Sequence, residues 1–241
     1  MMYLILSKKK VIGICILLIS GLLCGSFAAI RSHAGTFIKN GEITVIVDAG
    51  HGLPDGGAVG TRGTLEQEIN LKIAKKLQEV LEAKDINVIM TRETEDGLSD
   101  LKGASIRQMK VDDMKKRMAL MKKSDADLFI SIHINSYQND KATGLRVFYS
   151  PNFEEIKPLA ENIQARMSDI TNAKTSAVKP ADKRLFLMKN PPIAAILIEC
   201  GFLSNPEEEK KLSDSDYQAR LAWAVADALE KYYALQKSGQ K

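Results

Sequence analysis

The 241-residue chain has few residues that could cross-link it, because its cysteines are only Cys15, Cys24 and Cys200. The first two lie in an apolar segment near the N-terminus, so Cys200 stands alone in the rest of the chain. No disulfide can form within that part, and its stability must come from a hydrophobic core. With 45% hydrophobic and 27% charged residues, the composition is that of one ordinary globular domain.

The sequence also lacks the features of a nucleic-acid-binding protein. The formal net charge is only +4, and part of it comes from Lys8, Lys9 and Lys10. No stretch combines basic residues at helical spacing with interleaved aromatic residues. Internal repeats are absent too, and nothing indicates a second domain. We therefore expect a single domain and no nucleic-acid partner.

A targeting segment is the clearest feature of the N-terminal region. The lysine cluster precedes an apolar run from Val11 to Ile30 of about 20 residues, the length of a membrane span. The lysines should stay in the cytoplasm, which places the chain after Ile30 on the outer side of the membrane. Small residues near Ala28 and Ala34 offer cleavage sites, so the segment is either a removed signal peptide or a retained signal anchor. We expect this segment over residues 1–30, a linker over 31–41, the catalytic domain over 42–236 and a polar tail over 237–241.

Apolar runs and helical periodicity alternate after this segment. Short apolar runs predict buried strands over Ile43–Asp48, Ile86–Met90, Leu128–Ile132 and Ala194–Ile198. Two further strands are indicated, one at Leu145–Tyr149 that could lie at an edge and one at Leu185–Met188. Helices are expected over about 64–83, 109–123, 154–170 and 214–235, the first opened by a capping box at Thr64–Gln67. The alternation predicts a three-layer α/β fold, with a mostly parallel sheet flanked by helices.

Three of the predicted strands end in a side chain that can bind metal or move protons: His51, His133 and Glu199. Sites in such folds form outside the carboxyl ends of the strands, so these groups should lie close together. Glu66 is a fourth member, because it falls on the same helix face as apolar residues directed to the sheet, whereas Glu68 falls on the opposite face. Asn70, one turn below Glu66, could orient its carboxylate.

Two histidines and a carboxylate leave one coordination position open, which is typical of a catalytic zinc site. Glu199 would then be free to act as general base on water activated by the metal. Plainer readings exist for each residue. A histidine at a strand end is usually structural, Glu66 could simply favour the helix dipole, and Glu199 could belong to a buried salt bridge.

These residues carry a resemblance to a known family. The segments Asp48–Gly52, Ser131–Asn135 and Ile198–Asn205, with the Glu66–Asn70 step, resemble the zinc-dependent N-acetylmuramoyl-L-alanine amidases that cut peptidoglycan. The match runs in the family's order from Ile43 to about Tyr232. It implies that His51, Glu66 and His133 bind one zinc ion and that Glu199 is the catalytic residue. Arg117 matches a family arginine for which we expect a structural role, and the departures at Leu53 and Met121–Lys122 do not touch these ligands.

The chain resembles the sporulation and germination-specific subgroup of that family, because it shows no wall-binding repeats and has an N-terminal hydrophobic segment. Such enzymes remove the peptide from muramic acid on the way to the muramic-δ-lactam of the spore cortex. The resemblance implies peptidoglycan as substrate and an extracytoplasmic location, which for this subgroup is the intermembrane space of the developing spore. It also allows for a partner protein needed for zinc loading or activity.

Three alternatives remain open from the sequence. The chain could be another zinc-dependent wall hydrolase, such as a peptidase or deacetylase, or a non-catalytic wall-binding module. A cysteine hydrolase would use Cys200 with one of the histidines. However, Cys200 directly follows Glu199 on a strand, so the two side chains should point to opposite faces of the sheet.

Overall fold

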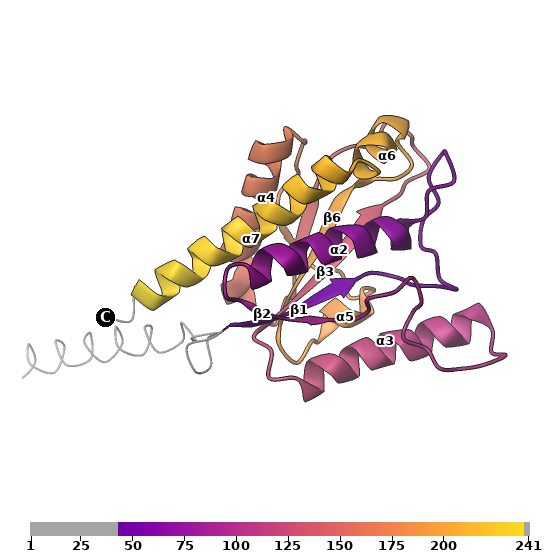
Figure 1. Cartoon of the computed structure of the whole chain (residues 1–241), viewed down its shortest axis with the longest axis horizontal. Coiled ribbons are helices and arrows are strands. Elements are labelled where there is room, and N and C mark those ends of the chain that lie inside the picture. Colours follow the sequence, from indigo (N-terminus) through magenta and orange to yellow (C-terminus); the bar gives the residue numbers. More distant parts are fainter. Residues whose placement is uncertain (1–42, 239–241) are drawn as a thin grey trace, which may run out of the picture. The chain divides into compact units, whose positions relative to one another are not determined.

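The structure is a computed structural model, and it describes residues 43–238 (Figure 1). The expected targeting segment and linker lie outside these residues. Among them a six-stranded sheet has the order β2-β1-β3-β6-β4-β5. Its strands are β1 (Thr44–Ala49), β2 (Asn87–Met90), β3 (Leu128–Asn135), β4 (Arg146–Tyr149), β5 (Lys179–Pro180) and β6 (Ala194–Phe202). The first four strands in that order are mutually parallel, whereas β4 runs antiparallel to β6.

Helices cover both faces of the sheet, as Figure 1 shows. They are α2 (Glu66–Glu82), α3 (Ile106–Lys123), α4 (Lys157–Thr171), α5 (Phe186–Lys189), α6 (Pro206–Leu212) and α7 (Ser215–Ser238), with a 3₁₀ turn at Glu154–Ile156 before α4. Helix α7 packs against both α2 and α4, whereas α3 contacts α5 on the opposite face. The three-layer, mostly parallel α/β fold expected from the sequence is therefore confirmed.

The core follows from the apolar runs of the central strands. Val45, Ile46 and Val47 of β1 are all fully buried, as expected for a strand covered on both faces. On the side of α3 and α5, a second apolar layer packs against the sheet and includes Phe129, Met121 and Leu197. Both β3 and β6 contribute side chains to this layer, so it packs against the strands that carry the predicted site residues.

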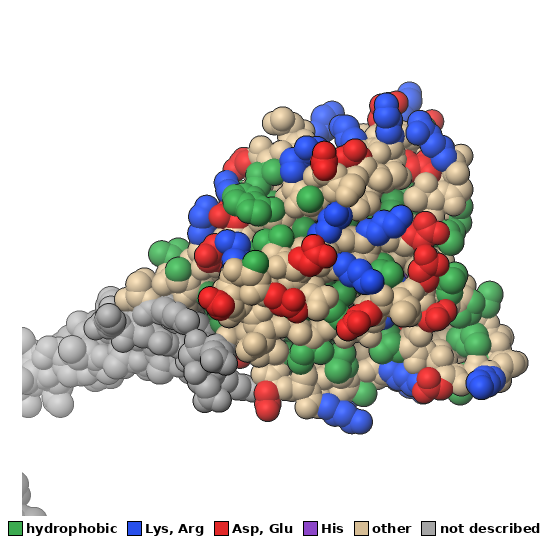
Figure 2. Space-filling model, viewed as in Figure 1, with side chains coloured by type: hydrophobic (Ala, Val, Ile, Leu, Met, Phe, Trp, Pro, Cys, Tyr) green, Lys and Arg blue, Asp and Glu red, His purple; other side chains and the backbone are tan. Residues whose placement is uncertain are grey.

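Charged side chains of both signs are interspersed over the face of the described residues that Figure 2 displays. Within residues 43–238, no helix has the length and apolar character needed to cross a membrane.

Two local predictions were wrong. Leu185–Met188 is not a strand but leads into helix α5, in which the consecutive residues Leu187 and Met188 are both buried. The amides of Met188 and Lys189 both donate to the carbonyl of Leu185 (2.9 and 3.0 Å), which closes a helical turn instead of pairing with a neighbouring strand. The capping box expected at Thr64–Gln67 is absent as well: the N-cap of α2 is Leu65, which makes no side-chain cap.

The start of α2 is capped by the loop before it. The amide of Glu66 donates to the carbonyl of Ala58 (2.9 Å), and the amide of Gln67 donates to that of Gly56 (3.1 Å). These bonds satisfy amides that have no partner inside the helix. The first turn of α2 is thereby joined to the glycine-rich loop that follows β1.

The register of the central strands brings their carboxyl ends to one edge. Asp48 of β1 lies beside Ser131 of β3, and His133 of β3 lies beside Glu199 of β6. Residues paired in the register point to the same face, and because these strands are parallel their carboxyl ends lie at the same edge of the sheet. The edge formed by β1, β3 and β6 is thus where the polar side chains predicted from the sequence meet.

Candidate active site

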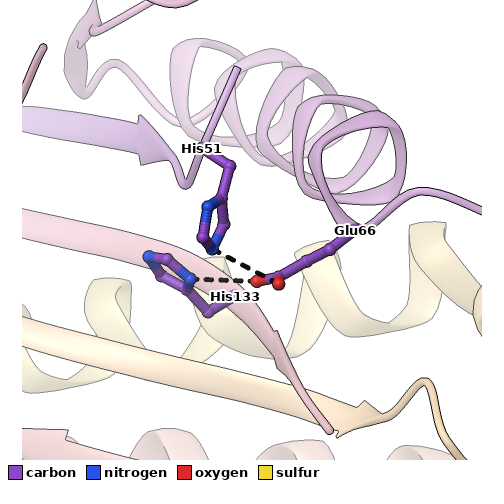
Figure 3. Close-up of side chains that lie close together, drawn as sticks. All are labelled: His51, Glu66 and His133. Atoms are coloured by element: carbon purple, nitrogen blue, oxygen red, sulfur yellow. Dashed lines mark hydrogen bonds and ion pairs between the residues drawn. The ribbon is translucent and has the colours of Figure 1, made fainter. Parts of the chain in front are cut away.

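His51, Glu66 and His133 converge at this edge (Figure 3). Nε2 of His51 lies 3.3 Å from one carboxylate oxygen of Glu66, and Nδ1 of His133 lies 3.0 Å from the other. One ligand atom from each residue lies within 4.8 Å of the other two. Glu66 is 4% exposed, so its carboxylate is directed to the core as its helix position predicted. Two imidazole nitrogens and one carboxylate oxygen are the donor set of a catalytic zinc site.

Asp55 orients the first histidine. Its carboxylate lies 2.9 Å from Nδ1 of His51 and also 2.9 Å from Nζ of Lys110 on α3. A hydrogen bond from Nδ1 to a carboxylate leaves Nε2 free as a ligand and sets the direction of the ring. The backbone of His51 has a φ of 62°, in the left-handed region that non-glycine residues rarely adopt. Contacts from other parts of the fold must therefore keep the loop in this conformation.

Three buried side chains hold the backbone of that loop. The guanidinium of Arg117 on α3 donates to the carbonyls of Ala49 (2.9 Å) and His51 (2.6 Å). Arg92, just after β2, donates to the carbonyls of Ala49 (2.9 Å) and Gly50 (3.1 Å). Asn70 donates to Gly50 (3.1 Å) as well. The carbonyls of three consecutive residues therefore have side-chain donors from α3, from α2 and from the segment after β2.

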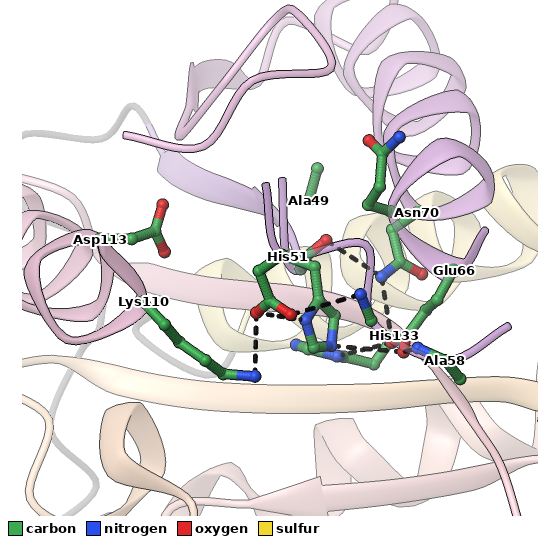
Figure 4. Close-up of polar contacts among 12 residues, drawn as sticks. Ala49, His51, Ala58, Glu66, Asn70, Lys110, Asp113 and His133 are labelled. Atoms are coloured by element: carbon green, nitrogen blue, oxygen red, sulfur yellow. Dashed lines mark hydrogen bonds and ion pairs between the residues drawn. The ribbon is translucent and has the colours of Figure 1, made fainter. Parts of the chain in front are cut away.

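Asn70 also bonds to the carboxylate of Glu66, as the sequence predicted. Its amide nitrogen lies 3.2 Å from one carboxylate oxygen of Glu66, and the backbone amide of Ala58 donates to the other at 2.9 Å (Figure 4). The amide of Ile134 donates to Glu66 at 3.1 Å. These bonds fix the carboxylate in place between the two imidazoles.

The electrostatics of this cluster favour a cation. Burial opposes ionisation of Glu66, but hydrogen bonds from His133 and His51 outweigh it and hold the pKa of Glu66 well below its usual range. Burial also disfavours a charged His51, but hydrogen bonds to Asp55 and Glu66 raise its pKa to about 9. The carboxylates of Glu66 and Asp55, both with lowered pKa values, are thus ionised at neutral pH beside the imidazole of His51. A divalent cation among the three ligand atoms would supply the positive charge that this arrangement favours.

Glu199 lies next to His133 in the strand register but is not one of the three grouped donors. One of its carboxylate oxygens is buried and has no hydrogen-bond partner among the described residues. Burial raises the pKa of Glu199 to about 7, and nearby Glu66 acts in the same direction, against the opposing charge of His133. A carboxylate with a pKa near neutrality can both accept and return a proton, which is what a general base requires.

A pocket of about 90 Å³ opens beside Glu199 and His133. Its walls are mainly apolar and come from α3 and α5, including Met114, Leu187 and Met188. The unpartnered carboxylate is therefore next to a space that can receive part of a ligand.

Cys200 does not share this space. It is 1% exposed, and burial raises the pKa of its thiol well above the ordinary value. Its side chain alternates with that of Glu199 along β6, so it points to the face covered by α7 and α4. The cysteine-hydrolase alternative has no support in this geometry.

The sequence pointed to the four polar residues at the edge and to Asn70, but it missed Asp55 and Arg92. Asp55 lies in an irregular loop, where no periodicity indicates where a side chain points. The buried contacts of Arg92 depend on the pairing of β2 with β1. An acid four residues after a strand-end histidine was the one signal that could have identified Asp55.

Comparison with known proteins gives one consistent result. Residues 45–231 match the N-acetylmuramoyl-L-alanine amidase family. The chain is 33% identical over 189 residues to the germination-specific N-acetylmuramoyl-L-alanine amidase of Bacillus subtilis (strain 168), which covers 78% of this chain and 79% of that relative.

Solved structures of N-acetylmuramoyl-L-alanine amidases are similar to the described fold. The CwlD amidase from Clostridioides difficile, solved in complex with the GerS lipoprotein, is 36% identical with a TM-score of 0.77, covering 80% of this chain and 100% of that one. The N-acetylmuramoyl-L-alanine amidase from Clostridium difficile 630 is 32% identical with a TM-score of 0.68, covering 79% of this chain and 96% of that one.

Proposed function

The chain belongs to the N-acetylmuramoyl-L-alanine amidase family, and from that premise we propose that His51, Glu66 and His133 hold one zinc ion and that Glu199 is the general base. The protein is a hydrolase of the amide bond between the lactyl group of N-acetylmuramic acid and L-alanine of the stem peptide. The observation that carries the proposed site is the grouping of three donor atoms within 4.8 Å beside a buried carboxylate that has no partner.

The donor set fits zinc better than a hard cation. Two of the three donors are imidazole nitrogens, which suit zinc, whereas calcium and magnesium take oxygen ligands. When bound, zinc supplies a Lewis acid that polarises a carbonyl and makes water more acidic. Asp55 and Asn70 then keep His51 and Glu66 directed at the ion.

Glu199 carries the proton in this mechanism. Its unpartnered oxygen takes a proton from the attacking water and passes it to the nitrogen of L-alanine as that nitrogen leaves. A pKa of about 7 for Glu199 suits both halves of the transfer. Because Glu199 lies beside His133 and outside the ligand group, the residue can act without leaving the metal short of a donor.

Peptidoglycan of the spore cortex is the proposed substrate. The similarity to a germination-specific amidase supports this role, in which removal of the peptide leads toward muramic-δ-lactam. We place the domain from about residue 42 to 236 outside the cytoplasmic membrane, secreted or anchored through residues 1–30, and in the intermembrane space of the developing spore if the cortex role holds.

A partner protein is proposed as well. The similar CwlD amidase was solved in complex with a lipoprotein. By that likeness we expect a partner that assists zinc loading or activity of this chain.

Mass spectrometry of digested muropeptides, with and without a chelator, tests the function. We expect free stem peptides and an intact glycan, and no products after chelation. Cleavage within the stem peptide would instead identify a zinc peptidase, and loss of acetate a deacetylase. No turnover by zinc-loaded protein, with its partner present, would favour a wall-binding module.

A further inference from the structure

Arg146 extends the site beyond the four residues already described. It lies on β4, directly opposite Glu199 of β6 in an antiparallel pair. Residues directly opposite in such a pair have their side chains on the same face, with Cβ atoms about 5 Å apart. The guanidinium is therefore presented beside the general base. Its charge is among those that oppose the burial-driven rise in the pKa of Glu199.

Two aromatic rings hold this guanidinium. Its central carbon lies 5.1 Å from the ring centre of Tyr137 and 5.0 Å from that of Phe202. The two rings themselves meet edge to face with centres 5.1 Å apart, and Nη1 of Arg146 donates to the Tyr137 hydroxyl at 2.6 Å. Stacking on aromatic faces restricts a side chain that would otherwise be mobile.

The segments that carry these two aromatic rings are themselves anchored. The carboxylate of Glu208 accepts hydrogen bonds from the amides of Phe202 and Gly144, both at 2.8 Å, and so joins the end of β6 to the turn before β4. The amide of Tyr137 donates to the hydroxyl of Ser204 at 3.1 Å. Arg146 is thus held in a fixed position.

What the guanidinium lacks is an anion. Arg117, Arg166 and Arg184 each pair with an aspartate. Arg146 makes no ion pair with any residue in the described part of the chain, and Glu199 stays unpaired beside it. A guanidinium has five N–H donors, and the hydrogen bond to the Tyr137 hydroxyl uses one of them. The remaining donors can take a carboxylate in the bidentate manner that arginine favours.

We propose that Arg146 binds the α-carboxylate of the second residue of the stem peptide, a D-glutamate joined to the rest of the peptide through its γ-carboxyl. This inference rests on the proposed function. In that substrate the α-carboxylate is one peptide unit beyond the L-alanine whose nitrogen leaves. Successive Cα atoms are about 3.8 Å apart, so the carboxylate is within reach of a side chain on the strand next to Glu199.

The test compares two synthetic N-acetylmuramoyl tripeptides that differ at one group. In one, the D-glutamate has a free α-carboxylate; in the other, that group is a carboxamide. We expect wild-type protein to prefer the carboxylate by on the order of tenfold to a hundredfold in kcat/KM, mainly through KM. Arg146→Gln should remove the preference, and Arg146→Lys should restore part of it, because lysine keeps the charge without the fork.

Arg166→Gln is the matched control, because Arg166 also stacks on an aromatic ring, that of Trp223, but pairs with Asp227 elsewhere in the fold. It should keep the wild-type preference. Equal cleavage of the two substrates by wild type overturns the proposal. Equal losses on both substrates in Arg146→Gln, with a shifted pH profile, also overturn it and would mean that Arg146 acts through Glu199.

Calorimetry of the two free tripeptides lacking the sugar separates this inference from the proposed function. If zinc-loaded wild type, with its partner present, cleaves neither substrate, the amidase assignment fails. Tighter binding of the carboxylate peptide to wild type, lost in Arg146→Gln, would still support the arginine's role, and equal binding of both would overturn it. If Arg146→Gln does not fold, as judged by circular dichroism, the Arg146→Lys variant decides: an unchanged preference in it contradicts bidentate binding.

Discussion

Glu66 contacts both histidines, one through each carboxylate oxygen, although it comes from a helix and they come from strand ends. Its other bonds, from Asn70 and from the amides of Ala58 and Ile134, leave it little freedom to turn. At the scale of single residues, the site is therefore organised around this carboxylate. Each histidine supplies one more donor from a fixed direction.

Removal of either histidine should remove the metal. His51→Ala and His133→Ala each leave two donors, so we expect elemental analysis to show zinc falling from about one per chain to near zero, with loss of amidase activity. Glu68→Ala is the matched control, because Glu68 lies on the same helix and makes none of the site's contacts. Full zinc occupancy in both histidine variants would falsify the ligand assignment.

Glu199 is the residue at which binding and catalysis should separate. Glu199→Gln keeps the size of the side chain but removes the base, which typically costs about a hundredfold to ten-thousandfold in rate. Zinc content and folding should stay near wild type, because the three donors remain. Kinetics and metal analysis of the same sample check both parts. If the variant instead loses its zinc, Glu199 is a ligand; if it keeps substantial activity, the base lies elsewhere.

At the scale of elements, helix α3 holds the end of β1 through one buried ion pair. Arg117 pairs with Asp48, and both side chains are nearly inaccessible to solvent. Burial would raise the pKa of Asp48, but the charge of Arg117 and the Ser131 hydroxyl outweigh it, so the pKa lies below its ordinary 3.8. The same guanidinium donates to the carbonyl of His51, which links the ion pair to the backbone conformation of that histidine.

We expect Asp48→Asn to destabilise the fold by about 1–3 kcal/mol at pH 7, because it removes one of the two carboxylates that neutralise the buried Arg117 charge and leaves only Asp113. The ionised form of Asp48 stabilises the wild type above pH 3.8, and this contribution is lost as the pH falls through the lowered pKa. The difference in free energy of unfolding between wild type and variant should thus become smaller in strong acid. Urea unfolding across the pH range measures it.

Asp182→Asn supplies the control for this experiment, because Asp182 pairs with Arg184 at the exposed surface. Its unfolding curve should overlay that of the wild type. A gap for Asp48→Asn that stays constant down to strong acid would show that the charge of Asp48 is not what stabilises β1.

At the scale of the whole molecule, the site needs the complete sheet. Its residues come from the loop after β1, from α2, from β3 and from β6, and no two adjacent elements of the chain contain them all. The neighbouring Arg146 on β4 extends the same edge. Such a site forms only when the domain has folded.

The location can be tested in vegetative cells that produce the protein and have been stripped of their wall, because in a developing spore the mother-cell membrane would shield the intermembrane space from added protease. Because the lysine cluster precedes the apolar run, the domain after Ile30 should be accessible to added protease. Carbonate extraction then separates an anchored form, which stays with the membrane, from a released one. Protection until the cells are lysed would place the domain on the cytoplasmic side.

Much of this protein was determined by local sequence. The apolar runs predicted β1, β3 and β6, because buried parallel strands need continuous apolar residues. The helical spacing of Glu66 with Ile69 and Ile73 directed that carboxylate inward, which its 4% exposure confirms. The family motifs, each contiguous in the chain, lie at the strand ends that form the site.

Other features were decided only by tertiary structure. Thr64 should have capped α2, but the carbonyls of Ala58 and Gly56 took that role once the loop folded back. Arg117 and Asp48 are 69 positions apart, and Arg146 meets Glu199 through an antiparallel register that no spacing in the chain encodes. The physical reason is that strand pairing sets which distant residues become neighbours, whereas periodicity reports only which side of its own element a residue occupies.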